Sequence, residues 1–226
     1  MNIMKFGIIV FPGSSGEVDL THIIKDSLDC VVEVIHHEET HLDKFDAYLL
    51  SGGFSYGDYL RCGAIAATTP VITPLKEEIA KGKLVLGIGN GFQILTEAGI
   101  LPGALRPHHH EKFQCGSRIL KVENSQTLFT KEFEKGEMIL LPIAHKVGHY
   151  YAEPSTLMKL QESNRIVFTY QSNKMDSSLG VAGILNETGN VLGMMPHPER
   201  ACDRLLGNVE GLRLFKSILN AWREKT

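Results

Sequence analysis

The first half of the chain alternates short apolar runs with stretches of helical spacing, and this alternation restricts the fold more than any other feature. The runs at residues 5–11 and 84–88 end at Pro or Gly, as buried strands commonly do. Between them, residues 18–28 and 72–80 place apolar side chains at roughly helical spacing. Such alternation predicts an α/β fold of flavodoxin type, in which helices cover both faces of a mostly parallel sheet.

The other expected elements fit the same plan. Further strands are expected at residues 31–35 and 47–50, and a further helix at residues 90–98. The second half changes to strand-like runs that extend the sheet or form an antiparallel flank, at residues 118–122, 138–141, 166–170, 181–185 and 191–195. The tail, residues 203–222, is predicted to be an amphipathic helix. Because the chain contains no linker and no repeat, residues 1–226 are expected to form a single domain.

Charge and apolar length exclude several classes of function. The 23 basic and 26 acidic residues give a formal net charge of -3, which favours neither nucleic acid nor an anionic membrane as a partner. The start of the chain has no long apolar run and no signal-peptide pattern, so we expect a cytoplasmic protein. The cysteines form no C-x-x-C pair and are expected to be reduced thiols that serve in packing: Cys30, Cys62, Cys115 and Cys202.

A glycine-rich turn follows the strand expected at residues 84–88. Gly87, Gly89 and Gly91 alternate just before the helix, but Phe92 stands where a dinucleotide-binding G-x-G-x-x-G loop needs its last glycine. The alternative is a nucleophile elbow, a sharp strand-to-helix turn whose middle residue carries the reactive side chain. Here the middle residue is Gly89, which has no side chain, so such an elbow lacks its nucleophile.

A rigidly held histidine follows the last predicted strand. Pro196 and Pro198 bracket His197 and restrict the backbone on both sides of it. Glu199, two residues later, is able to orient an imidazole and stabilise its cationic form. We therefore predict that His197 is a functional residue and that it faces Gly89 across a site.

Together these segments resemble a family of enzymes. The run from Gly87 to Gly91, the following Phe92-Gln93-Ile94-Leu95 and the segment from Pro196 to Arg200 are similar to class I glutamine amidotransferases. The runs 51–63 and 11–14, with Met194-Met195, narrow the resemblance to the glutaminase subunits of phosphoribosylformylglycinamidine synthases of purine biosynthesis. The resemblance covers nearly the whole chain.

The resemblance implies a chemistry and a set of residues. In that family a cysteine at the position of Gly89 attacks L-glutamine, forms a thioester and releases ammonia to a larger subunit. His197 matches the family's base and Glu199 its orienting carboxylate. The positions expected to bind the oxyanion or the substrate are Gly52, Gly53, Asn90 and Gln93. No cofactor or metal is implied in this subunit; ATP and magnesium belong to the large synthase subunit, and a small third subunit is also expected.

The sequence departs from the family at more positions than the nucleophile. Ser15-Gly16-Glu17 stands where Asn-Cys-Asp is usual, and Ala144-His145-Lys146-Val147-Gly148 where Ala-His-Gly-Glu-Gly is usual. Gly116 replaces a basic residue. Cys62 lies in a segment that the family keeps beside its true nucleophile, so it is not expected to replace it. This scatter of changes favours natural loss of the glutaminase over a laboratory knock-out.

The remaining histidines carry weaker signals. His108-His109-His110 is consecutive and favours a solvated loop over a metal site, because neighbouring residues cannot all face one ion. His36, His37 and His41 are expected at the surface.

The sequence therefore leaves three functions open: a glutaminase that supplies ammonia, a non-catalytic docking and activating subunit of the same synthase, and a small-molecule-binding flavodoxin-like module. The missing side chain at Gly89 supports the non-catalytic subunit.

Overall fold

The computed structural model describes residues 3–107, 112–171 and 178–224. Within this part of the chain, nine strands form one sheet in the order β2-β1-β3-β4-β11-β10-β9-β6-β7. The parallel half consists of β1 (Lys5–Val10), β2 (Val31–His36), β3 (Ala47–Leu50), β4 (Leu84–Ile88) and β11 (Val191–Met194). These are the strands expected from the sequence.

The other half of the sheet is antiparallel. It adds β10 (Val181–Leu185), β9 (Ile166–Tyr170), β6 (Gln114–Val122) and β7 (Met138–His145) beyond β11. The sequence left two alternatives for these strands, an extension of the sheet or an antiparallel flank. Both are correct, because the antiparallel strands continue the same sheet. Strands β6 and β7 are longer than predicted, because Gln114, Gly116 and Ser117 break the apolar pattern at the start of β6 and Pro142 breaks that of β7.

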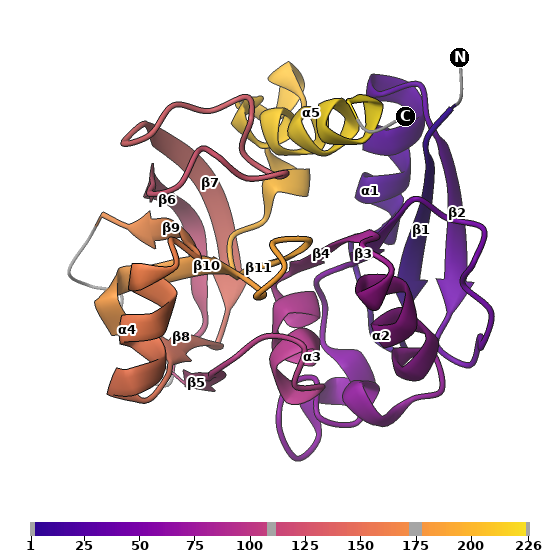
Figure 1. Ribbon diagram of the computed structural model, residues 1–226, viewed down its shortest axis with the longest axis horizontal. Helices are drawn as coiled ribbons and strands as arrows, with labels where there is room; N and C mark the ends of the chain where they lie inside the picture. Colours follow the sequence, from indigo (N-terminus) through magenta and orange to yellow (C-terminus); the bar gives the residue numbers. More distant parts are fainter. Residues whose placement is uncertain (1–2, 108–111, 172–177, 225–226) are drawn as a thin grey trace.

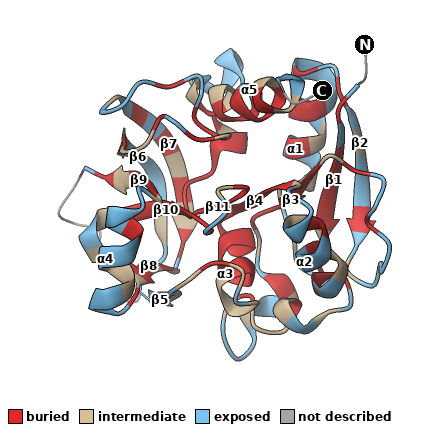
Figure 2. Ribbon diagram, viewed as in Figure 1, coloured by how far each residue is buried: buried red, intermediate tan, exposed pale blue. Residues whose placement is uncertain are grey.

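Helices cover both faces of the sheet (Figure 1). Leu20 of α1 (Glu17–His22), which continues as a π-helical turn, and Phe215 of α5 (Glu210–Arg223) belong to one hydrophobic core. Leu75 of α2 (Ile72–Ala80), Phe92 of α3 (Asn90–Glu97) and Leu160 of α4 (Pro154–Glu162) belong to the other. The central strands are buried, whereas β2 and the outer helix surfaces are exposed (Figure 2). The fold class predicted from the sequence is confirmed.

One α-helix and two strands of the described residues were not predicted. Helix α4 and the two-stranded ribbon of β5 (Ala104–Pro107) and β8 (Val147–Tyr151) have short or half-exposed patterns that local periodicity does not reveal. The helix predicted over residues 203–222 is wrong at its start. Asp203 and Asn208 form an isolated bridge around a 3₁₀ turn, and α5 begins only at Glu210. Leu205, which the helical spacing placed on a buried stripe, is 93% exposed.

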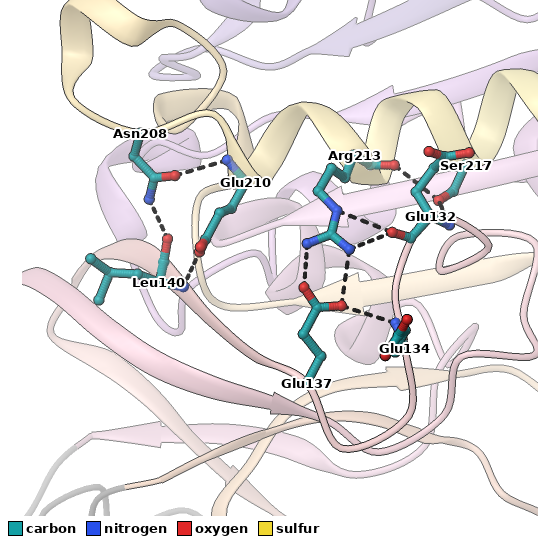
Figure 3. A network of polar contacts seen from close by, with 8 residues as sticks. All are labelled: Glu132, Glu134, Glu137, Leu140, Asn208, Glu210, Arg213 and Ser217. Carbon is teal, nitrogen blue, oxygen red and sulfur yellow. Dashed lines mark hydrogen bonds and ion pairs between the residues drawn. The ribbon is translucent and has the colours of Figure 1, made fainter.

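The edge strand β7 is covered by the segment that follows His197. The backbone N–H of Leu140 donates to the carboxylate of Glu210, and its carbonyl accepts from the side chain of Asn208 (Figure 3). The carbonyl of Pro142 accepts from the backbone N–H of His197 at 2.8 Å. Open edges otherwise invite pairing with another chain, so these bonds protect β7 and tie the position of His197 to the sheet.

Candidate functional site

The predicted site residues meet at the carboxyl end of the parallel strands. Ser51-Gly52-Gly53 follows β3, Gly89 follows β4, and Pro196-His197 lies just beyond β11. Since β3, β4 and β11 are neighbours in the sheet, these loops lie side by side. Sites in open α/β sheets commonly form at this edge.

The turn at Gly89 has the geometry of an elbow. Gly89 has φ 53° and ψ −109°, a conformation that L side chains rarely adopt. Its backbone N–H donates to Met194 at 2.8 Å, which fixes the turn against β11. A Cβ on Gly91 would lie 2.2 Å from the Leu50 carbonyl oxygen, so only glycine allows α3 to pack this close to β3.

His197 faces Gly89, as the sequence predicted. A Cβ built on Gly89 would lie 3.1 Å from Nε2 of the ring, within the reach of a nucleophile–base pair. A Cβ on Gly52 would lie 2.7 Å from Cε1 of the same ring. Gly52 must therefore remain glycine for the imidazole to hold its place, whatever its backbone contributes to an oxyanion site.

Glu199 orients the imidazole. Its Oε1 lies 2.6 Å from Nδ1 of His197, and both side chains are buried. With the carboxylate accepting, Nδ1 carries the hydrogen and the lone pair of Nε2 points toward Gly89. This is the arrangement of a general base without the group that it would deprotonate.

Gly53, Asn90 and Gln93 also reach the site. The backbone N–H of Ser55 donates to Oδ1 of Asn90 at 3.1 Å, and Nδ2 of Asn90 donates to Oε1 of Gln93 at 2.8 Å. Gly53, with φ 133°, forms an isolated bridge with Ser14. The geometry gathers the predicted residues in one place, while the roles assigned to them remain predictions.

The space enclosed by these residues is small. The cavity at the elbow has a volume of about 20 Å³, whereas a groove lined by Arg165 and Thr188, residues outside the predicted site, encloses about 820 Å³. The cavity is lined by Gly53, Phe54, Asp58, Cys62, Gly89, Asn90, Gln93, Ala144, His145, Lys146, Val147, Met195 and His197.

Several buried polar atoms at or beside the site lack hydrogen-bond partners within the described ranges: Ser51 Oγ, Ser55 Oγ, Asp58 Oδ1, His197 Nε2 and Glu199 Oε2. Most buried polar groups in proteins are satisfied, so a cluster of exceptions marks a site rather than a core. Sequence reasoning did not single out the side chains of Ser55 and Asp58. Their only signal was membership of the run 51–63.

Cys62 lines the site but is not suited to attack. Burial, together with the neighbouring Asp58, raises the pKa of its thiol to about 12. The thiolate, which is the nucleophilic form, is therefore scarce at neutral pH. All four cysteines were predicted to be packing residues. This prediction is wrong for Cys115, which is exposed on β6, and only partly correct for Cys62, which is half-buried and lines the site. Cys30 and Cys202 are buried, as expected.

The histidines expected at the surface differ in their exposure. His36 and His41 are exposed, but His37 is half-buried, with Nδ1 3.2 Å from the hydroxyl of Tyr56. The segment His108–His110 lies outside the described residues. His145, which belongs to the segment 144–148 that departs from the family pattern, is buried at the site.

A model of the CobB/CobQ-like glutamine amidotransferase domain matches residues 4–216. The chain belongs to this family. Among solved structures, this amidotransferase is similar to a chain of PurLQS from Thermotoga maritima, with 40% identity over 98% of this chain and 100% of that one, and a TM-score of 0.90.

More distant solved structures share the fold of this amidotransferase. A putative GMP synthase protein from Thermoplasma acidophilum is 16% identical over 99% of this chain and 98% of that chain, with a TM-score of 0.67. The glutaminase domain of Trypanosoma brucei CTPS is 12% identical over 97% and 94%, with a TM-score of 0.62. None of the described helices has the length and apolarity to cross a membrane.

Proposed function

We propose that this chain is the glutamine amidotransferase subunit of a phosphoribosylformylglycinamidine synthase and that it hydrolyses little or no glutamine. The 40% identity to a PurLQS chain over nearly the full length of both carries the first part. The absence of a side chain at Gly89 supports the second part, the loss of glutamine hydrolysis, because thioester formation needs a nucleophile at that position. The chain then serves to dock on and activate its partner.

What the remaining residues do follows from their geometry. His197 holds a lone pair toward Gly89 and Glu199 holds the ring in place, but no thiol receives their help. Activation of water by His197 would lack the covalent intermediate that divides the reaction into two easier steps. Loss of a triad nucleophile lowers turnover by on the order of 10⁶.

The partners belong to the same proposal. A large subunit would carry ATP and magnesium and perform the amidation, and a small third subunit would complete the complex. No cofactor is proposed for this chain. We also place the complex in the cytoplasm, where cysteines such as exposed Cys115 stay reduced.

The test is synthesis by the reconstituted complex. With L-glutamine as the nitrogen source, glutamate release and formylglycinamidine ribonucleotide formation should stay at background. With ammonium salts, product should form at a rate that depends on this chain. Glutamine-dependent turnover that Cys62→Ser abolishes would instead make Cys62 a relocated nucleophile. Equal ammonium-dependent rates with and without the chain would remove the activating role.

A further inference from the structure

A relay of amides links residues that line the same cavity as Gly89, namely Asn90, Gln93 and Val147. The backbone N–H of Ser55 donates to Asn90, and Asn90 donates to Gln93. Nε2 of Gln93 then donates to the backbone carbonyl of Val147 at 2.6 Å. The relay therefore runs from the loop after β3, through the first turn of α3, to the start of β8.

The relay uses polar groups of both amide side chains. Asn90 and Gln93 are 4% and 5% exposed, and in each the carbonyl oxygen and one amide hydrogen are already bonded within the protein. The enclosed volume of about 20 Å³ suits about one water molecule. Pockets that bind small molecules usually enclose about 300 Å³ or more.

The closing group is backbone, and the surrounding structure holds it in place. Val147 is the first residue of β8 and pairs with Pro107 of β5. The ring of His145 packs against Gly148, where a Cβ would lie 2.3 Å from Cδ2 of the imidazole. The carbonyl of Val147 is thus fixed between a packed histidine and a paired strand, so a simple rotation of one side chain does not remove it.

We infer that the site of this chain excludes L-glutamine, because the side-chain amide of Gln93 already donates a hydrogen bond to the Val147 carbonyl. The inference rests on the proposed function, in which this space corresponds to a glutamine pocket. Loss of the glutaminase then has two independent causes, the missing thiol at Gly89 and the closed pocket. Restoring the thiol alone does not restore the reaction.

The first measurement uses the unaltered chain. Isothermal titration calorimetry with L-glutamine should give no saturable heat at millimolar ligand. Saturable binding of L-glutamine, but not of D-glutamine, would overturn the inference directly. This experiment needs no variant, so it decides the question even if a variant fails to fold.

The second measurement asks whether Val147 is the block. Gly89→Cys is treated with a diazoketone analogue of L-glutamine, and adducts at residue 89 are mapped by peptide mass. We compare it with Gly89→Cys carrying Lys146→Gly and Val147→Glu, the residues usual in the resembled subunits. Glycine at residue 146 frees the backbone before β8. Digests of the unfolded proteins show that the thiol is present in both.

Labelling should be at least about tenfold greater in the variant with the opened segment, corresponding to about 1.4 kcal/mol or more in favour of the analogue. Equal labelling of the two proteins, whether strong or absent, would show that residues 146 and 147 do not close the site. Ammonium-dependent synthesis by the complex tests the proposed function separately. If the complex made no product from ammonium salts while the binding and labelling results matched a closed pocket, the proposed function would be wrong and the closure of the pocket would still stand.

Discussion

The imidazole of His197 lies across Gly89, such that a Cβ on the glycine would be 3.0 Å from Cε1 and 3.1 Å from Nε2 of the ring. The site thus keeps the base and the elbow of a nucleophilic enzyme, while the residue between them has no side chain. Both the positive φ at residue 89 and the nearness of the ring would act against any side chain placed there.

Gly89→Cys should lower the free energy of unfolding by about 1 kcal/mol, because φ 53° disfavours an L residue. Urea unfolding measures the change. Gly99→Cys is a matched control, since Gly99 has φ 67° and a Cβ there would meet open space. The Gly89 variant should lose more stability than the control. A more stable Gly89→Cys protein would contradict the elbow geometry.

Glu199→Ala should lower stability by about 3 kcal/mol, because Nδ1 of buried His197 would lose its partner. Glu199→Gln keeps an acceptor of the same shape and should cost clearly less. Thermal and urea unfolding provide the comparison. If both variants matched the unaltered chain, the bond between His197 and Glu199 would contribute nothing to the fold.

Thiol reactivity should follow burial and pKa. Iodoacetamide should label exposed Cys115 fastest and half-buried Cys62 much more slowly, with Cys30 and Cys202 protected. Because the pKa of Cys62 is raised to about 12, its labelling rate should stay low between about pH 7 and pH 9. Peptide mass spectrometry over time measures each rate. Fast labelling of Cys62 at neutral pH would mean that its thiolate is stabilised at the site.

The pair formed by Glu137 and Arg213 should stabilise the protein in a pH-dependent way. The two side chains bond through both carboxylate oxygens, and Arg213 also donates to the carbonyl of Glu132 (Figure 3). Arg213 holds the pKa of Glu137 below its ordinary value of 4.5. The contribution is therefore complete above pH 4.5 and is lost as pH falls through the lowered pKa of the folded state.

Glu137→Gln should accordingly cost about 1 kcal/mol at pH 7, a value limited by partial solvent exposure, and almost nothing once the carboxyl of the unaltered chain is protonated. Unfolding by urea at neutral and acidic pH measures both values. Glu187→Gln, on an exposed turn, should change stability little at either pH. A cost for Glu137→Gln that stays constant with pH would show that the ion pair is not its source.

Local patterns in the sequence determined the parallel half of this protein. Apolar runs ended by Gly or Pro located β1, β3 and β4 because a buried parallel strand is apolar on both faces. The alternating glycines located the turn at Gly89, and the prolines around His197 marked its rigid position. Each of these signals spans only a few neighbouring residues, so it can be read without knowing the fold.

Only the tertiary structure decided how the site is closed. The carbonyl of Val147 and the backbone N–H of Ser55 are main-chain groups that every residue type carries, so no side-chain pattern marks their contacts with Gln93 and Asn90. The start of α5 was likewise set by distant bonds, since Asn208 and Glu210 are held by Leu140 of β7. Contacts between residues about 50 or more positions apart depend on how the sheet brings its strands together, which local periodicity does not encode.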